Sequence, residues 1–263
     1  MFAMKIIELK DISFQYQSGS ENFSLDDINL PVKKGDYTSL MGPNGSGKST
    51  LLKLISGVVQ PNLGVVNLLG KNITHYSRKE IARKIAFVPQ STGNAYPFSV
   101  FEIVMMGRSP YLNLWGNEKK EDIEIVRESL NQVGIYHLRE KGINEISGGE
   151  AQRAYIARAI AQKTEMILLD EPNSHLDIEH QIAIFKLLKE FNESAGTTII
   201  TISHDLNLAA SFCKKGIILN QGALVKEGMI GEVLTEENIK MYFNVNSKIE
   251  RHKSSFTISI LAS

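Results

Sequence analysis

The 263-residue chain is 43% hydrophobic and 22% charged, which suits one large globular domain or one domain with a sizeable insertion. Lysine plus arginine equals aspartate plus glutamate at 29 each, so no long-range field favours nucleic acid, and a bound anion must be held by local geometry. The single cysteine, Cys213, excludes an intrachain disulfide framework, and no apolar run approaches the roughly 18 residues that cross a bilayer.

Alternating apolar and polar residues at 4–34 predict short strands on either side of a polar turn. From there the chain alternates apolar strands with helical stretches, and continuous apolar strands belong in a sheet that is covered on both faces. The sequence therefore predicts an α/β core. We expect its buried strands at 37–41, 84–88, 166–169, 197–202 and 216–219.

Between 91 and 160 the pattern changes to amphipathic stretches, in which Ile123, Val126, Leu130 and Val133 recur every three or four residues. We interpret this stretch as a helical subdomain inserted in the core. Beyond about residue 232, the sequence GEVLTEENIKMYF predicts a helix, whereas the ending FTISILAS could not be assigned.

A glycine-rich motif, GPNGSGKST, follows the first predicted buried strand and opens a helical run. In this G-x-x-x-x-G-K-S/T pattern, backbone N–H groups and the helix N-terminus converge on phosphate oxygens. Lys48 is expected to bridge the β- and γ-phosphates of ATP, and the Ser49 hydroxyl to bind Mg²⁺. The expected nucleotide contacts here are Gly42, Asn44, Gly45, Ser46, Gly47, Lys48, Ser49 and Thr50.

Two consecutive carboxylates end the apolar strand of MILLDEP, at the edge of the sheet where α/β folds place ligands. Adjacent residues on a strand point in opposite directions, so the two acids can take different roles. Asp170 suits the Mg²⁺ shell, and Glu171 suits orienting and deprotonating an attacking water. The alternative is a strand end that is exposed and merely acidic.

Three further side chains are candidates for the same site. His204 follows another predicted buried strand and would reach a γ-phosphate, although a lone histidine is more often structural. Gln90, two residues beyond the strand at 84–88, would reach Mg²⁺ or the attacking water. Tyr16 would stack on adenine through its ring face, but a half-buried strand aromatic is the commoner meaning.

A second glycine pair lies in ISGGEAQR, where Ser147 and Glu150 form the S-x-x-E pattern of a helix capping box. A capped helix start that carries Gly148 and Gly149 is another potential anion site. Alone, this pattern is better explained as an ordinary helix cap. Counted with the phosphate loop, the ISGGE motif gives the chain two helix starts that could bind phosphate. The chain has only one set of residues for Mg²⁺ and for the base.

Taken together, GPNGSGKST, Gln90, ISGGEAQR, MILLDEP, SHLD and His204 resemble the ATP-binding cassette (ABC) ATPase family over about residues 4–240. The resemblance implies a P-loop NTPase core with a small antiparallel β subdomain and a helical subdomain at about 91–160. It places these in an ATPase domain at 1–240, followed by a tail at 241–263 of unknown role. It also implies a head-to-tail dimer with two ATP molecules between the subunits, so that Gly148 and Gly149 serve the partner's nucleotide.

The same resemblance assigns roles residue by residue. Tyr16 matches the adenine-stacking aromatic, Gln90 the glutamine that links nucleotide and membrane partner, Asp177 the aspartate at the dimer seam, and His204 the switch histidine. These four residues, together with the signature residues Ser147 and Glu150, complete the nucleotide site that the resemblance implies. The sequence departs from the family at Ile146, usually leucine, and at Asn173, commonly threonine or serine, but neither change touches a phosphate contact.

Within the family, the segment at 99–116, SHLDI and HDLNLAA resemble the ATPases of importers for iron-siderophore complexes, haem and vitamin B12. Zinc and manganese importer ATPases share much of this pattern. The resemblance implies a peripheral subunit at the cytoplasmic face of the membrane, coupled to transmembrane permease subunits and, indirectly, to a substrate-binding protein. A non-transport cassette ATPase and an exporter ATPase stay as alternatives.

An apolar cluster soon after Gln90 is expected to be partly exposed, because its helical portion cannot turn every side chain inward. We expect a short helix of the permease to dock on it. The cluster consists of Tyr96, Pro97, Phe98, Val100, Phe101, Val104 and Met105.

Overall fold

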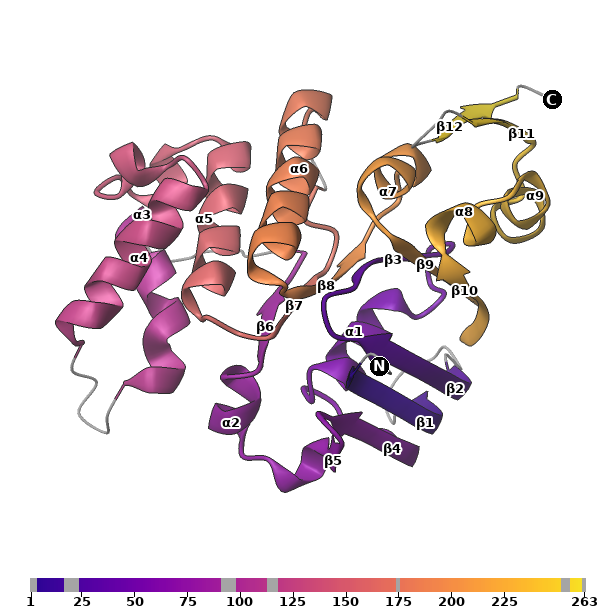
Figure 1. The fold of residues 1–263 in the computed structure, drawn as a ribbon, viewed down its shortest axis with the longest axis horizontal. Helices are drawn as coiled ribbons and strands as arrows, with labels where there is room; N and C mark the ends of the chain where they lie inside the picture. The colour runs from indigo at the N-terminus through magenta and orange to yellow at the C-terminus, as the bar shows by residue number, and fades with distance from the viewer. Residues whose placement is uncertain are drawn as a thin grey trace.

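The computed structural model describes residues 4–16, 24–90, 98–112, 118–173, 176–251 and 256–261 (Figure 1). Its strands are β1 (Lys5–Gln15), β2 (Ser24–Lys33), β3 (Tyr37–Met41), β4 (Leu63–Leu68), β5 (Lys71–Asn72), β6 (Ile85–Val88), β7 (Met166–Leu169), β8 (Thr198–Ile202), β9 (Lys215–Asn220), β10 (Ala223–Met229), β11 (Ser247–Arg251) and β12 (Phe256–Ile260). Its α-helices are α1 (Lys48–Ile55), α2 (Arg78–Ala82), α3 (Val100–Met105), α4 (Lys120–Gln132), α5 (Gly148–Ala161), α6 (Ile178–Ala195), α7 (Leu206–Phe212), α8 (Ile230–Val233) and α9 (Glu236–Phe243). Short 3₁₀ helices are η1 (Ile73–His75), η2 (Met106–Tyr111), η3 (Tyr136–Leu138) and η4 (Ile143–Glu145).

The central sheet has the strand order β10-β9-β3-β8-β7-β6, and its strands are parallel except for β10 at one edge. Every residue of β3, β7 and β8 is buried. Along β7, Ile167 and Leu169 enter one hydrophobic cluster, and Met166 and Leu168 enter another on the opposite face. This confirms the predicted α/β core, because a sheet covered on both faces requires apolar residues at successive positions.

A second, antiparallel sheet has the order β2-β1-β4-β5 and packs its apolar residues against α1 and one face of the central sheet. The strands predicted within 4–34 are confirmed as β1 and β2, although the predicted turn at 17–22 lies outside the described residues. The sequence analysis did not predict β4, whose first residues Leu63, Gly64 and Val65 are exposed. A strand with so little burial at its start lacks the apolar alternation by which strands are recognised.

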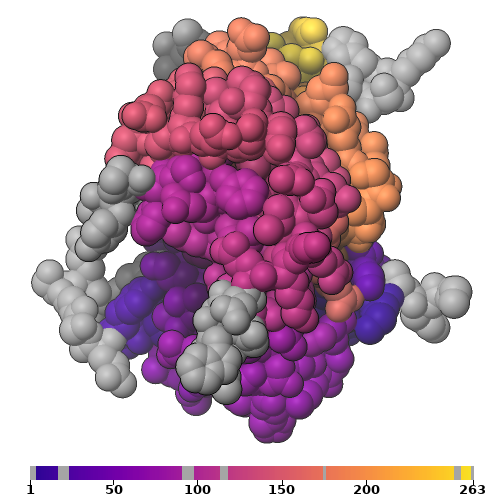
Figure 2. All heavy atoms as spheres, turned by 90° about the vertical axis from the view of Figure 1, so that its left-hand side faces the viewer, coloured from indigo at the N-terminus to yellow at the C-terminus, as the bar shows by residue number. Residues whose placement is uncertain are grey.

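Helices α3, α4 and α5 pack together beside the central sheet, and they cover much of the face seen in Figure 2. Val126, Leu130 and Val133 are buried there and Ile123 is partly buried, so the periodicity predicted the inward face of α4. The described part of 98–160 contains no strand, only the isolated bridge between Ser99 and Gly142. The division into an ATPase domain at 1–240 and a tail at 241–263 stays a prediction.

The chain continues through α8 and α9 into the hairpin of β11 and β12. The helix predicted from about 232 is confirmed as α9, but α8 ends at Val233 and a break at Leu234 separates the two. The unassigned sequence FTISILAS contains β12. The amide of Asn207 on α7 holds this strand, donating to the Ile258 carbonyl at 3.0 Å and accepting from the Ile258 N–H at 2.8 Å.

The GRSPY stretch of η2 joins the helical layer to α2. Arg108 is buried, with its Nε 2.9 Å from an Asp122 oxygen on α4 and its Nη1 donating to the Ala161 carbonyl on α5 at 2.8 Å. The Tyr111 ring lies 4.1 Å from the Arg108 guanidinium and 5.2 Å from that of Arg83. The stretch that carries the resemblance to chelate importers is therefore also a structural junction.

The buried pair of Arg108 and Asp122 generates a stability prediction. Asp122→Asn keeps the side-chain shape but leaves the guanidinium without its counter-charge, so we expect the free energy of unfolding to fall by about 3 kcal/mol. Glu124→Gln, which breaks the exposed pair of Glu124 and Arg127, should cost less than about 1 kcal/mol. Urea denaturation measures both, and equal small losses would contradict a structural role for the buried pair.

Candidate active site

The phosphate-loop motif runs from the end of β3 to the start of α1. Gly42 has φ +144°, and a Cβ built there would lie 2.0 Å from the carbonyl oxygen of Leu219 on β9. No other residue fits at this position, because the adjacent strand occupies the space that a side chain needs. The loop is thereby fixed against the central sheet, and its last glycine, Gly47, precedes the first residue of α1, Lys48.

The Lys48 ammonium lies across the loop, donating hydrogen bonds to the carbonyl oxygens of Gly42 and Pro43 at 2.9 Å each. Burial lowers the pKa of Lys48, and the carboxylates of Glu171 and Asp170 oppose that effect. A cavity of about 230 Å³ opens beside it. This cavity is lined by Asn44, Gly45, Gly47, Lys48, Ser49, Thr50 and Glu171.

Two of the three expected Mg²⁺ ligands, Ser49 and Asp170, lie next to each other, whereas the third, Gln90, donates its amide to Glu171. The Ser49 hydroxyl donates to an oxygen of Asp170 at 3.0 Å, although the two residues come from α1 and the end of β7. Burial raises the pKa of Asp170, while the hydrogen bond from Ser49 lowers it. Hydroxyl and carboxylate oxygens are the ligand type that Mg²⁺ prefers, so this pair fits the cation.

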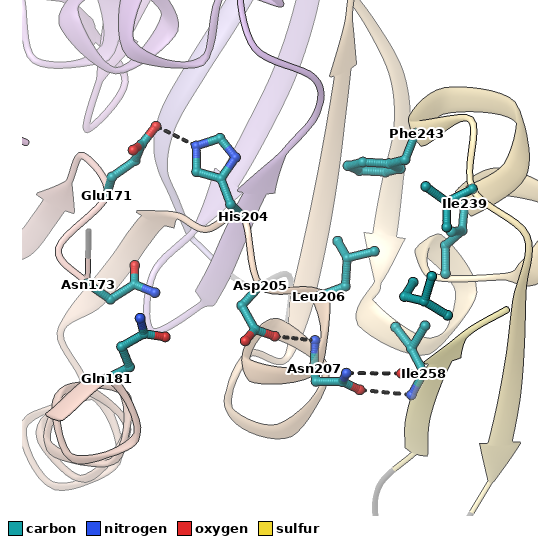
Figure 3. Close-up of a pocket in the computed structure, with 12 residues that line it drawn as sticks. Glu171, Asn173, Gln181, His204, Asp205, Leu206, Asn207, Ile239, Phe243 and Ile258 are labelled. Carbon is teal, nitrogen blue, oxygen red and sulfur yellow. Dashed lines mark hydrogen bonds and ion pairs between the residues drawn. The ribbon is translucent and has the colours of Figure 1, made fainter. Parts of the chain in front are cut away.

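Glu171 is held between two side chains from the neighbouring strands. Gln90, beyond β6, donates its Nε2 to one carboxylate oxygen at 2.6 Å. Nε2 of His204, beyond β8, lies 2.6 Å from the other carboxylate oxygen, a contact that Figure 3 shows. The backbone of Glu171 has φ +48°, a left-handed conformation that is uncommon outside glycine. The structure thus brings two of the residues predicted for catalysis, Gln90 and His204, to the carboxylate of a third, Glu171.

Tyr16, predicted to stack on adenine, lies just beyond β1 on the antiparallel sheet. Its side chain is exposed and makes an edge-to-face contact with Phe14, with ring centroids 4.8 Å apart. An exposed ring face is available for stacking. Its role at the nucleotide stays a prediction.

The capping box predicted at ISGGE is confirmed at the start of α5. The Glu150 N–H donates to Ser147 Oγ at 3.3 Å, and the Ser147 N–H donates to the Glu150 carboxylate at 2.8 Å. The two glycines differ in their surroundings. A Cβ at Gly148 would only touch Leu176 at 3.7 Å, whereas one at Gly149 would lie 2.3 Å from the ring of His180.

Asp177, predicted at the dimer seam, is the N-cap of α6. Its carboxylate accepts the His180 N–H at 2.9 Å and lies 2.6 Å from the same residue's ring Nδ1. These hydrogen bonds, the backbone one first, lower the pKa of Asp177. His180 was not predicted from the sequence. Its place three residues after the helix-capping Asp177 is where a backbone N–H bonds to the cap. Ser174 and His175 of SHLD lie outside the described residues.

The apolar cluster after Gln90 is predicted to be partly exposed, and three of its five described members are buried. Val100, Val104 and Met105 are buried, because one face of α3 packs against α4 and α5. Phe101 is partly buried against the same core, while Phe98, just before the capped start of α3, is 37% exposed. The other two, Tyr96 and Pro97, lie outside the described residues.

A larger cavity, of about 660 Å³, extends from Glu171 and His204 to the C-terminal segment (Figure 3). Glu171 and His204 lie on one side, and Ile239, Phe243 and Ile258 line the other. Asn173, where the sequence departs from the family pattern, also lines it. The sequence did not predict this cavity, because its apolar wall forms only when the predicted helix, α9, meets β12, which lies in the unassigned ending FTISILAS.

Residues 25–174, more than half of the chain, match the family model described as ABC transporter. This chain belongs to the ABC transporter family. The predicted resemblance and the predicted P-loop fold are thereby confirmed, and the chain is an ATPase of that family. None of the helices in the described part of the sequence combines the length and apolarity that crossing a bilayer requires.

Several characterised relatives are similar over most of their length. The chain is 40% identical to the iron(3+)-hydroxamate import ATP-binding protein FhuC of Bacillus subtilis, over 86% of this chain and 84% of that protein. It is 38% identical to the ferric enterobactin transport ATP-binding protein FepC of Escherichia coli, over 85% and 83% of the two chains.

Solved structures agree with this assignment. A chain of a transporter described as of the metal-chelate type, in an inward-facing conformation, superposes with a TM-score of 0.84 at 32% identity, covering 98% of this chain and 97% of that one. The ABC cassette MJ0796, solved as a dimer, gives a TM-score of 0.75 at 32% identity, covering 85% and 98%.

The unequal surroundings of the two signature glycines generate a second stability prediction. Gly149→Ala places a methyl group against the His180 ring and should lower the free energy of unfolding by about 1–3 kcal/mol. Gly148→Ala meets no such contact and should change it by less than about 1 kcal/mol in either direction. Thermal denaturation without nucleotide compares the two, and a Gly149→Ala protein as stable as the parent would contradict the described packing.

Proposed function

We propose that this chain is the nucleotide-binding subunit of an importer for ferric siderophores or a similar metal chelate, and that it hydrolyses Mg-ATP to drive uptake. The observation that carries the catalytic part is the clamped carboxylate, in which Gln90 and His204 hold Glu171 beside the loop of Lys48. The cargo class rests on the relatives, which are named for hydroxamate, enterobactin and petrobactin transport.

The proposed chemistry is transfer of the γ-phosphoryl group to water. Glu171 accepts the proton of the attacking water, and His204 fixes the carboxylate and would contact the γ-phosphate. Lys48 exchanges its bonds to two loop carbonyls for phosphate oxygens and neutralises their charge. Ser49 and Asp170 would hold Mg²⁺, which would supply charge neutralisation for the phosphates.

The second half of each site is proposed to come from another copy of the chain. Gly148 and the capped start of α5 would close on the γ-phosphate that the partner's loop holds, giving a two-fold symmetric dimer. Similarity to the dimeric cassette structures supports this arrangement. The permease is proposed to bind at the cytoplasmic face of the membrane, with Phe98 as an exposed apolar contact near Gln90.

The proposed base generates a kinetic prediction. Glu171→Gln keeps the shape of the side chain but cannot accept a proton, so turnover should fall by about 10²-fold or more while Mg-ATP affinity stays within a few-fold. Glu190→Gln, on the exposed part of α6, is the matched control and should hydrolyse ATP like the parent. Steady-state phosphate release gives the answer, and parental turnover in Glu171→Gln would remove this residue from the role of base.

The proposed permease contact generates a further prediction. Phe98→Asp puts a charge on the exposed aromatic, so the variant should co-purify poorly with its permease yet bind ATP with normal affinity. Leu63→Asp, which charges an exposed apolar residue on the antiparallel sheet, is the control and should co-purify normally. Undiminished co-purification of Phe98→Asp would contradict the contact.

A further inference from the structure

His180, in the first turn of α6, occupies the space beside the signature glycines. A Cβ built on Gly149 would lie 2.3 Å from its Cδ2, 2.9 Å from its Cγ and 3.0 Å from its Nε2. All of these atoms belong to the imidazole ring, so the ring itself packs on the backbone of α5. The absent side chain at Gly149 is therefore explained within one chain, by contact with His180.

The ring is held in that position by Asp177. A single carboxylate oxygen accepts the backbone N–H of His180 and lies 2.6 Å from its ring Nδ1. With one nitrogen fixed by this bond, the ring cannot rotate away from Gly149 without losing a partner. Asp177, His180 and Gly149 thus connect the start of α6 to the start of α5, two helices that stand side by side in Figure 1.

Stability alone gives little reason for this arrangement. The side chains of His180 and Asp177 are 38% and 68% exposed. An exposed ion pair contributes at most about 1 kcal/mol, and ordering two side chains costs entropy. The arrangement instead fixes a position, because it holds the first turn of α5, with Gly148 and Gly149, against the segment that follows β7.

We propose that His180 is a positioning residue of the composite nucleotide site, holding the Gly149 turn and Asp177 as one unit that closes on the γ-phosphate carried by a second copy of the chain. This inference rests on the proposed ATP-dependent dimer. His180 acts through Gly149 and Asp177. Its loss should therefore weaken closure of the dimer on ATP and leave the nucleotide affinity of the single subunit unchanged.

The test measures binding in a Glu171→Gln background, in which slow hydrolysis lets ATP-bound dimers persist. The dissociation constant of the dimer is measured with Mg-ATP by analytical ultracentrifugation, and ATP affinity is measured at dilutions where the protein is monomeric. His180→Ala should raise the dimer dissociation constant by about tenfold or more, as expected when binding groups are displaced. Lys186→Ala, an exposed change further along α6, should not alter it.

Each outcome has one meaning. An unchanged dimer constant in His180→Ala overturns the inference, and so does an equal loss of monomer ATP affinity, which would place the histidine at its own chain's nucleotide. Gly148→Asp separates the proposed composite site from the proposed role of His180. If Gly148→Asp weakens the dimer and His180→Ala does not, the composite site is supported and the role of His180 is overturned. A parent that forms no dimer with ATP overturns the proposed dimer and this inference together.

A double-mutant cycle tests the contact itself. Gly149→Ala should destabilise the chain because of the ring, and His180→Ala in the same chain should remove that penalty. Additive effects on the free energy of unfolding would show that the ring does not occupy the Gly149 site and would overturn the proposed linkage.

Discussion

Burial of the central sheet on both faces determines where its charged side chains can lie. Every residue of β3, β7 and β8 is buried and none of them is charged, so the charged groups lie where these strands end. Parallel strands end together at one edge, so residues far apart in sequence meet there. This arrangement brings together the phosphate loop, the acids Asp170 and Glu171, and His204.

The polar groups at this edge bond to one another. The Lys48 ammonium uses two loop carbonyls, Ser49 uses Asp170, and Glu171 uses Gln90 and His204. Groups of this kind would be costly to bury without partners. A nucleotide therefore exchanges one set of hydrogen bonds for another, and its affinity reflects the difference between the two sets.

The sequence predicted those features whose physical signal is local. Apolar runs identified the buried strands, and glycine spacing identified the loop, because each depends on neighbouring residues alone. The sequence did not predict β4 or the strands of the C-terminal hairpin, because partly exposed strands have little apolar alternation. The sequence did not show which members of the apolar cluster after Gln90 are buried, because the partners that bury Val104 lie on other helices, α4 and α5.

Residue roles proved hardest to predict where packing between distant segments decides them. Gly149 was assigned to a partner's phosphate, yet its lack of a side chain is also required by His180 of the same chain, thirty-one positions later. Asp177 was assigned from resemblance, and only the structure gives its bond to the same histidine. A sequence motif gives the residue types at a site. The role of each residue also depends on which other residues of the folded chain it contacts.

The pairing of Asn207 with Ile258 links the helix after His204 to a strand that lies 51 residues later in the chain. Proteins are synthesised from the N-terminus, and domains fold in that order. When β7, β8 and α7 have already emerged from the ribosome, the Asn207 amide still lacks both of its hydrogen-bond partners. The helix that follows His204 therefore completes the hydrogen bonding of its Asn207 side chain only after residue 258 has been translated, so its attachment to the C-terminal hairpin forms later than the sheet that it follows.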